Sequence, residues 1–94
     1  MNYYILFYKT SKNYLEDRKP FRDQHLAQAK AAQEAGNLLL AGALEDPTDE
    51  AMLIFKANDL SIVEDFAKSD PYVLNGVVKH WQISPWKVVM GSLM

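Results

Sequence analysis

Two short segments of the sequence contain residue types that can exchange protons. Residues 22–26 read RDQHL, and residues 70–73 read DPYV. Histidine has an unperturbed pKa of about 6.5, so the imidazole of His25 can accept and return a proton near neutral pH. A carboxylate such as that of Asp70 can accept an imidazole N–H, which fixes the tautomer of the ring and stabilises its protonated form. The two side chains would form a proton-transfer dyad if the fold brought them together.

His25 also has a purely structural interpretation. Phe21, His25, Ala29 and Ala32 recur at spacings of four, four and three, which predicts the inward face of one helix. A half-buried histidine that donates to a backbone carbonyl would fit this face equally well. Both interpretations remain open at the level of the sequence.

Asp70 has a structural alternative of its own. An Asp-Pro pair is a favoured start for a short helix, with Asp70 as the N-cap and Pro71 at the first position. That helix would cover residues 72–75 and end at Gly76. Removing such a cap costs about 1 kcal/mol, which is enough to explain the motif. The two roles are compatible, because the second oxygen of a capping carboxylate could accept the imidazole N–H.

Arg22 and Tyr72 are the candidate substrate-binding residues. Arg22 precedes His25 by one helical turn and could hold an anionic substrate group, or it could form a surface ion pair with Asp23, Glu16 or Asp17. Tyr72 could donate to a ligand oxygen, or its ring could pack beneath a helix. A second histidine, His80, lies on an expected strand, where an interface or hydrogen-bonding role is favoured.

The elements that must position these residues follow from periodicity and breaker residues. We expect strands at 3–8, 38–44, 51–57 and 77–84, and helices at 20–35 and from a cap at Asn58 or Asp59 to about residue 69. Residues 10–19 read as a loop, 46–49 as a hairpin turn, and Pro85 as the start of a tail. The order is β-α-β-β-α-β, which predicts an α+β, ferredoxin-like fold with a four-stranded antiparallel sheet and both helices on one face.

The expected strands are apolar on both sides. An antiparallel sheet with one face in water should alternate apolar and polar residues, so a second copy of the sheet is the expected cover for the free face. In the first strand the two sides are Tyr3, Ile5 and Phe7 against Tyr4, Leu6 and Tyr8; in the second they are Leu38, Leu40 and Leu44 against Leu39, Ala41 and Ala43.

Four motifs in this order resemble the YCII (YciI-like) family. They are Arg22-x-x-His25-Leu26, Gly36-x-Leu38-Leu39-x-Ala41-Gly42, Asp70-Pro71-Tyr72-Val73-x-x-Gly76-Val77 and Pro85-x-Lys87-x-Val89. The resemblance implies a ferredoxin-like fold that dimerises sheet to sheet into a dimeric α/β barrel. It also implies an active site centred on His25 and Asp70. Some relatives are dehydrochlorinases of hydroxylated aromatic rings. Some members carry an insertion in the hairpin, where this chain has only residues 45–50.

The first functional hypothesis is a cofactor-independent small-molecule enzyme of the lyase, isomerase or dehydrochlorinase type. His25 would act as general acid or base, Asp70 would orient it, and Arg22 and Tyr72 would position the substrate. The second hypothesis is a non-catalytic ligand-binding or accessory dimer that uses the same pocket. A cofactorless monooxygenase is a third, weaker hypothesis.

The bulk composition sets the remaining expectations. The 94 residues suit a single domain, 1–94, with 49% apolar and 23% charged residues. The net charge of −2 argues against a nucleic-acid partner. There is no cysteine and no spaced set of metal ligands, so we expect no metal and no cofactor. Residues 1–8 are apolar but too short to span a membrane, so we expect no signal peptide, no membrane anchor and a cytoplasmic location.

Overall fold

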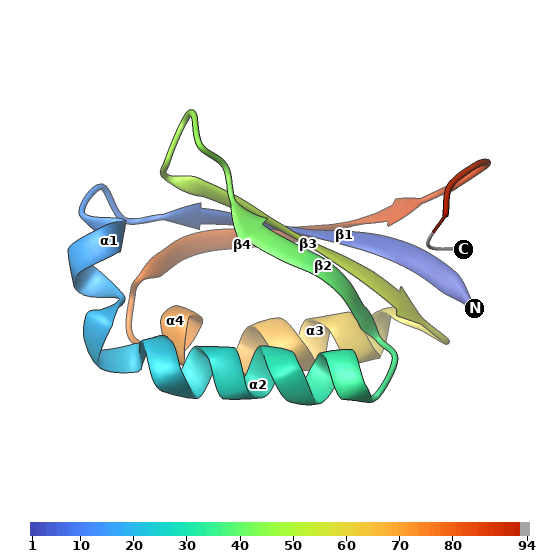
Figure 1. Ribbon diagram of the computed structural model, residues 1–94, viewed down its shortest axis with the longest axis horizontal. Coiled ribbons are helices and arrows are strands. Elements are labelled where there is room, and N and C mark those ends of the chain that lie inside the picture. Colours follow the sequence, from blue (N-terminus) through green and yellow to red (C-terminus); the bar gives the residue numbers. More distant parts are fainter. Residues whose placement is uncertain (93–94) are drawn as a thin grey trace.

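A computed structural model of the protein describes residues 1–92. These residues form four strands and four helices, with one short 3-10 turn before the longest helix (Figure 1). The strands are β1 Asn2–Thr10, β2 Leu38–Ala43, β3 Glu50–Ala57 and β4 Val78–Trp86. The helices are α1 Tyr14–Asp17, α2 Arg22–Glu34, α3 Leu60–Ser69 and α4 Pro71–Leu74, and the 3-10 turn is η1 Lys19–Phe21.

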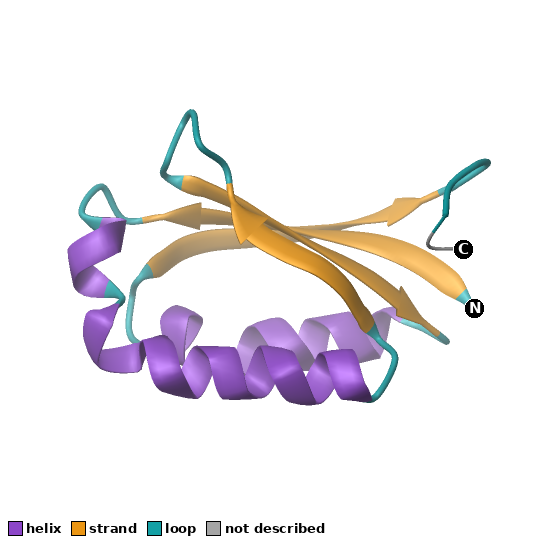
Figure 2. Cartoon of the chain, in the orientation of Figure 1, coloured by secondary structure: helices purple, strands orange, loops and turns teal. Residues whose placement is uncertain are grey.

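The strands form one antiparallel sheet in the order β2-β3-β1-β4. The helices α2, α3 and α4 lie together beneath one face of this sheet, and no described helix covers the other face (Figure 2). This is the predicted α+β, ferredoxin-like arrangement, and the prediction of the fold class is confirmed. We call the uncovered side of the sheet the open face.

The core lies between the sheet and the helices. Alternate residues of β1 and β3 are buried, as the period of two of a strand with one covered face requires. From the helix side, Val63, Phe66 and Ala67 of α3 meet them, and the ring of Phe66 lies edge-on to that of Phe55 at 5.1 Å between centroids. The sheet residues of this core include Tyr4, Leu6, Tyr8, Ala51, Leu53, Phe55 and Ala57.

Side-chain caps begin the two helices that follow β3. The carboxylate of Asp59 accepts from the N–H of Ser61 at the start of α3, and that of Asp70 accepts from the N–H of Tyr72 at the start of α4. Gly76 follows α4 with φ of 74°, a left-handed conformation that glycine adopts without a Cβ clash. The predicted short helix, its cap and its glycine stop are therefore present.

The structure corrects the prediction in two connecting segments. Residues 10–19 are not all loop, because Asn13 starts the short helix α1, its carbonyl accepting from the N–H groups of Glu16 and Asp17. The tail does not begin at Pro85, because β4 continues through Pro85 to Trp86 and pairs with β1. β4 is an edge strand, so the missing N–H of a proline can face away from the ladder without loss of a hydrogen bond.

Two predicted faces also need correction. The pairing of β2 with β3 shifts between Leu38 and Leu40, so these two leucines lie on opposite faces of the sheet rather than together. On α2, the predicted inward residues are partly buried, but Gln28 is also turned inward. Position 28 is one helical turn after His25, so the two side chains share a face of α2. The amide of Gln28 donates from this face to the carbonyl of Phe66 at 3.0 Å.

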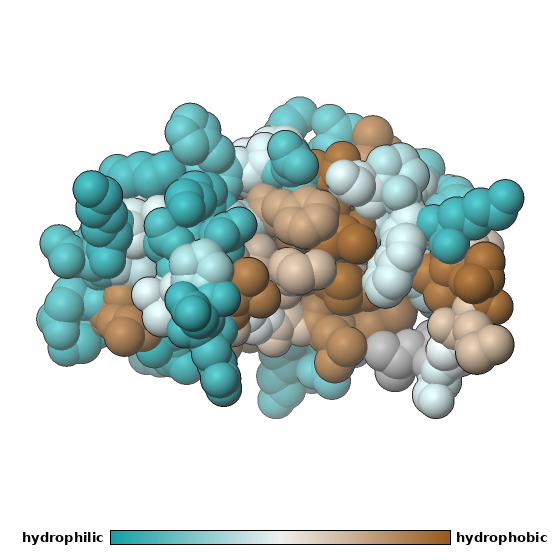
Figure 3. Space-filling view, turned by 90° about the horizontal axis from the view of Figure 1, so that it is seen from above, coloured by the Kyte–Doolittle hydropathy of each residue, from teal (hydrophilic) through white to brown (hydrophobic). Residues whose placement is uncertain are grey.

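The open face has an apolar centre and a polar end. Figure 3 looks onto this face and shows apolar side chains gathered over its centre. Directly paired residues of an antiparallel sheet share a face, so the register identifies both groups. The apolar members are Tyr3, Ile5, Phe7, Leu40, Met52, Ile54 and Trp86, and the polar members at the other end are Lys9, Glu50, His80 and Gln82. Two further polar residues lie among the apolar ones, Ser84 opposite Ile5 and Lys56 opposite Tyr3.

Within residues 1–92, no helix combines the length and the apolar character that crossing a bilayer requires.

Candidate active site

The fold places His25 of α2 against Asp70, the residue between α3 and α4. The imidazole Nδ1 lies 2.8 Å from the carboxylate Oδ1 of Asp70, which is hydrogen-bond distance. The side chain of Asp70 is fully buried, and that of His25 is 15% exposed. The contact that the sequence predicts is present, across 45 positions of the chain.

The carboxylate of Asp70 is held by three donors. Oδ1 accepts both from His25 and from the backbone N–H of Tyr72, the latter at 2.9 Å. Oδ2 accepts from the hydroxyl of Tyr8 at 2.7 Å. The cap and the imidazole therefore share one oxygen, whereas the sequence predicted one oxygen for each. Burial, together with the Asp70 carboxylate, raises the pKa of Tyr8 far above its ordinary value, so Tyr8 remains a donor to Asp70.

With Asp70 ionised, this arrangement favours one tautomer of the His25 ring. An ionised carboxylate only accepts hydrogen bonds, so Nδ1 then carries the proton that lies between His25 and Asp70. In the neutral ring, Nε2 then holds a free lone pair. Nε2 has no hydrogen-bond partner among the residues that the structure describes. His25 can therefore accept a proton at Nε2 while Asp70 stabilises the imidazolium that results.

Tyr72 packs directly on the His25 imidazole. The two rings are stacked, with centroids 3.9 Å apart and an interplanar angle of 9°. The residue is only 2% exposed, yet its hydroxyl has no hydrogen-bond partner within residues 1–92. The ring packs against a helix residue, as one interpretation of Tyr72 expects, whereas a role of its hydroxyl in binding a substrate stays a prediction.

A small cavity of about 50 Å³ lies beside the imidazole. Its size is that of one or two water molecules, since each occupies roughly 30 Å³ in the liquid. One wall consists of the small residues Ala41, Gly42 and Ala43 of the edge strand β2, and the other contributors are mostly hydroxyl-bearing. The cavity is lined by His25, Tyr8, Tyr72, Thr10, Tyr14, Ala51, Leu53 and the three residues of β2.

Two arginines lie on the same side of the protein as this cavity. Arg22 is the exposed first residue of α2, one turn before His25, and it forms no ion pair with any described residue. Burial and the neighbouring Tyr14 raise the pKa of Tyr72, whereas the charges of Arg22 and Arg18, and the approach of Arg22 to the hydroxyl as a donor, act in the opposite direction. Arg18 lies with its guanidinium carbon 5.0 Å from the ring centre of Tyr14 and donates to the hydroxyl of Tyr14 at 3.3 Å.

The predicted ion pairs of Arg22 are not seen. Glu16 instead binds Lys19 at 3.0 Å, and Asp17 accepts from the hydroxyl of Ser11 at 2.7 Å. Asp23 is exposed next to Arg22 in the chain without a described contact to it. The structure also shows no group of three or more metal-ligating side chains in the part of the chain that it describes.

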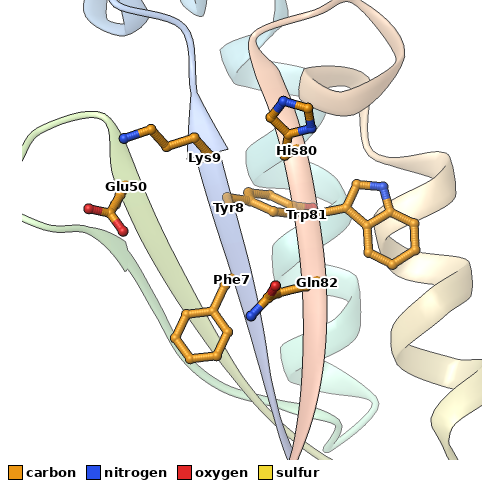
Figure 4. A pocket seen from close by; sticks show the side chains of 7 residues that line it. All are labelled: Phe7, Tyr8, Lys9, Glu50, His80, Trp81 and Gln82. Carbon is orange, nitrogen blue, oxygen red and sulfur yellow. The ribbon is translucent and has the colours of Figure 1, made fainter.

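His80 belongs to a different part of the molecule. Figure 4 shows it on β4 together with Gln82, near Lys9 of β1 and Glu50 of β3, around a shallow pocket of about 280 Å³. Lys9 in turn forms an ion pair with Asp49 at 2.8 Å. His80 therefore lies at the polar end of the open face and is not part of the His25 cavity.

Sequence reasoning missed four residues around the cavity: Tyr8, Thr10, Tyr14 and Arg18. The available signal was weak. Tyr8 falls on the inward side of a strand, and a buried tyrosine hydroxyl normally requires a partner, but nothing in the spacing names Asp70 as that partner. Tyr14 and Arg18 lie in the segment that the sequence assigns to a loop, so their i, i+4 relationship on a helical turn was not foreseen.

Comparison with known proteins places this chain in a family. The model of the YCII-related domain matches residues 1–87. An uncharacterised protein of Haemophilus influenzae is 35% identical, over 93% of this chain and 98% of the relative. The protein YciI of Escherichia coli O6:H1 is 30% identical, over 92% of this chain and 97% of the relative.

Solved structures share the fold at lower identity. The 5-chloro-2-hydroxyhydroquinone dehydrochlorinase of Burkholderia phenoliruptrix AC1100, in complex with 2,5-dihydroxybenzoquinone, has a TM-score of 0.76 at 18% identity, covering 90% of this chain and 93% of that one. A protein of Agrobacterium tumefaciens has a TM-score of 0.63 at 16% identity, covering 95% and 94%. Because the family model spans residues 1–87 and the two sequence relatives match over nearly their whole length, the chain belongs to the YCII-related domain family.

Proposed function

We propose that the protein is a small-molecule enzyme in which His25 and Asp70 carry out acid/base chemistry of the lyase or isomerase type. The observation that carries this proposal is the 2.8 Å contact between the buried Asp70 carboxylate and Nδ1 of His25. It leaves Nε2 as the free basic atom of a ring that lines a cavity. A base held in one tautomer on rigid elements is the arrangement that general base catalysis requires.

The reaction uses only groups of this chain. Nε2 of His25 removes a proton from an acidic carbon of the substrate, and the electron pair of that C–H bond moves into the substrate. In an elimination these electrons form a double bond while a leaving group departs as an anion. In an isomerisation the proton returns from Nε2 to a different carbon. Asp70 stabilises the imidazolium in both cases. The Tyr72 hydroxyl donates to a substrate oxygen, and Arg22 binds the substrate at the edge of the site.

The structural neighbour supports the same reaction type. The Burkholderia protein is by name a dehydrochlorinase of a hydroxylated, chlorinated ring. Loss of HCl from such a ring needs a base for the proton and a route for chloride to leave, which matches the chemistry open to His25. At 18% identity the similarity supports a shared fold only, so the substrate of this chain has to be identified by assay.

We also propose that residues 1–94 form one domain that pairs with a second copy through the open face. The apolar centre of that face contains seven large side chains. Exposed apolar patches of more than roughly 300–600 Å² are unusual on monomers. A second copy presents an equally apolar surface, and an isologous contact closes after two subunits.

The test of the enzymatic proposal is a panel of cyclic and aromatic carbon acids that includes 5-chloro-2-hydroxyhydroquinone. Mass spectrometry follows product formation, and an ion electrode follows chloride release. We expect turnover by the wild type, slowed about 10²–10⁴-fold in His25→Ala, as is typical of a general acid–base group. Asp59→Ala removes an exposed helix cap far from the cavity and should keep full activity. If compounds bind to the protein but none is converted, the enzyme hypothesis fails and the ligand-binding dimer becomes the favoured function.

A further inference from the structure

We propose that the ligand of the His25 cavity is a small anion, whose carboxylate or acidic hydroxyl oxygen accepts from the Tyr72 hydroxyl beside Arg18 and Arg22. This inference concerns the same cavity as the proposed function and rests on it only for the location. It adds the charge class of the substrate and a new binding residue, Arg18.

The first observation is the buried hydroxyl of Tyr72. The residue is 98% buried, and its oxygen has no hydrogen-bond partner within residues 1–92. A buried polar group without a partner destabilises a fold by about 1–3 kcal/mol, and native proteins rarely retain one without a function. Because Tyr72 lines the cavity beside His25, an acceptor oxygen that enters the cavity would complete this hydrogen bond.

The second observation is the positive charge on this side of the cavity. Neither Arg18 nor Arg22 pairs with a carboxylate in the part of the chain that the structure describes. Arg18 lies against Tyr14, whose ring in turn lies edge-on to Tyr72 at 6.1 Å between centroids. The guanidinium of Arg18 therefore lies beside the tyrosine pair from which the free hydroxyl comes, and Arg22 is near enough to Tyr72 for its charge to act on the Tyr72 pKa.

Apart from Asp23, which is exposed next to Arg22 in the chain, the carboxylates in this region are already engaged. Asp70 has three donors and is fully buried, Asp17 binds Ser11, and Glu16 binds Lys19. The site therefore offers two cations and one hydroxyl donor, and its buried anion faces the imidazole. A ligand oxygen with negative charge complements this arrangement, whereas a cationic ligand would be repelled by both arginines.

The same arrangement suits the proposed chemistry. Removal of a proton from carbon beside a carbonyl places negative charge on the oxygen. A hydrogen-bond donor and nearby cations that already face an anionic oxygen also stabilise this developing charge. The cavity of about 50 Å³ admits only the anionic edge of a molecule, so the remainder must lie toward the half-buried Arg18 and the exposed Arg22.

The test compares benzoate with benzamide, which has nearly the same shape without the charge, and with benzylammonium. Binding to the ¹⁵N-labelled wild type is followed by NMR shifts, which also identify the residues contacted. We expect benzoate to shift the resonances of His25 and Tyr72 and to bind at least tenfold more tightly than benzamide, whereas benzylammonium should not bind there. Raising the salt concentration should weaken only the binding of benzoate.

Three variants and one control separate the contributions of Arg18, Arg22 and Tyr72 to benzoate binding. Arg18→Gln and Arg22→Gln should each weaken benzoate about two- to fivefold, the range of a solvent-exposed charge pair, with no change for benzamide. Tyr72→Phe should weaken it about tenfold, because a hydrogen bond to a charged group is lost. Lys30→Gln removes one exposed charge from the same helix, away from the cavity, and should have no effect. A thermal melt confirms that each variant is folded.

The inference is overturned if benzoate does not bind, if benzamide binds as tightly, or if Lys30→Gln weakens benzoate as much as Arg22→Gln does. Binding needs no turnover, so the result is independent of the catalytic proposal. Selective binding of benzoate with full activity in His25→Ala would contradict only the mechanism. Equal binding of benzamide with activity lost in His25→Ala would contradict only the anion inference.

Discussion

At the scale of single residues, Asp70 accepts hydrogen bonds from a helix terminus, an imidazole and a phenol at once. Its stability role and its proposed chemical role can be separated by comparison with Asp59, whose side chain also accepts from the N–H two residues further on, but at an exposed position. Asp59→Ala therefore reports the loss of an exposed cap, together with the contact of Asp59 to the Ser61 hydroxyl.

We expect Asp59→Ala to lower the free energy of unfolding by about 1 kcal/mol. Asp70→Ala should lower it by about 2–4 kcal/mol, because the Tyr8 hydroxyl is also left buried and unpaired. Asp70→Asn keeps an acceptor for the N–H of Tyr72 and should recover part of this loss without restoring activity. Urea denaturation measures all three variants. Equal losses in Asp59→Ala and Asp70→Ala would show that Asp70 acts only as a cap.

Tyr8 predicts a dependence of stability on alkaline pH. Its pKa in the folded state lies above the ordinary value of about 10, mainly because the phenol is buried and also because Asp70 is near. Above about pH 10 the unfolded chain therefore binds fewer protons than the folded chain, and stability falls as pH rises, by up to about 1.4 kcal/mol per pH unit from this residue. Denaturation at several alkaline pH values measures the slope.

Tyr8→Phe is the matched control for this slope. It removes the titrating hydroxyl and keeps the ring, so the alkaline loss of stability should be shallower in the variant than in the wild type. The variant should also be less stable near neutral pH, since the buried Asp70 carboxylate loses one donor. Identical slopes in the two proteins would show that Tyr8 does not carry the effect.

The predictability of these residues from the sequence follows from how local their contacts are. Asp70 as a cap depends only on the residues that follow it, and the Asp-Pro pair is sufficient to predict it. The contact with His25 crosses 45 positions and came from the family resemblance together with the expected fold. The contact with Tyr8 crosses 62 positions, and no local pattern encodes it.

At the scale of elements, the short helix α4 holds Asp70 in place. It has only four residues, from Pro71 to Leu74, and is too short to be stable by itself. Its cap, the proline in its first turn and the left-handed Gly76 together define where the chain turns. Gly76 is therefore a position where the backbone requires glycine.

We expect Gly76→Ala to lower the free energy of unfolding by about 1–2 kcal/mol, the cost of a left-handed conformation for a residue with a Cβ. Gly42→Ala is the control, because Gly42 has no positive φ and an added Cβ would meet no described atom within 4 Å. That change should be close to neutral. Thermal denaturation of both variants checks the difference, and an equal effect at the two sites would refute the role of the turn.

The elements show what periodicity can and cannot predict. The period of two separates the two sides of β1 as expected, and β3 alternates in the same way, because these two central strands are regular. Since both sides of β1 are apolar, the pattern does not say which side faces the helices. The same reading fails in β2, where a shift in register after Leu38 reverses the faces. The end of β4 was also mispredicted, because a proline is a breaker in general but is tolerated on an edge strand.

At the scale of the whole molecule, the open face is an apolar surface that no described helix covers (Figure 3). Ile5 and Ile54 are directly paired at its centre. A charged residue introduced there would have to be buried without a partner in a sheet-to-sheet dimer. The same residue would be tolerated if this face were in water.

We expect the wild type to sediment as a dimer at micromolar concentration and Ile54→Lys to sediment as a folded monomer. Leu74→Lys makes the same kind of change at a position that is 67% exposed on α4 and should remain dimeric. A folded wild-type monomer in analytical ultracentrifugation would contradict the dimer, and so would a dimeric Ile54→Lys variant. The sequence predicts this interface only through the excess of apolar residues in the strands.

The account depends most directly on the chemical state of one imidazole. The sequence contains only two histidines, His25 and His80, so ¹⁵N NMR of the rings shows two sets of signals, which His25→Ala assigns. At about pH 9, well above the ordinary imidazole pKa of about 6.5, we expect His25 to carry its proton on Nδ1 and to have a bare Nε2. Asp70→Ala should abolish this preference. A wild-type His25 with its proton on Nε2 would contradict the proposed proton-transfer pair.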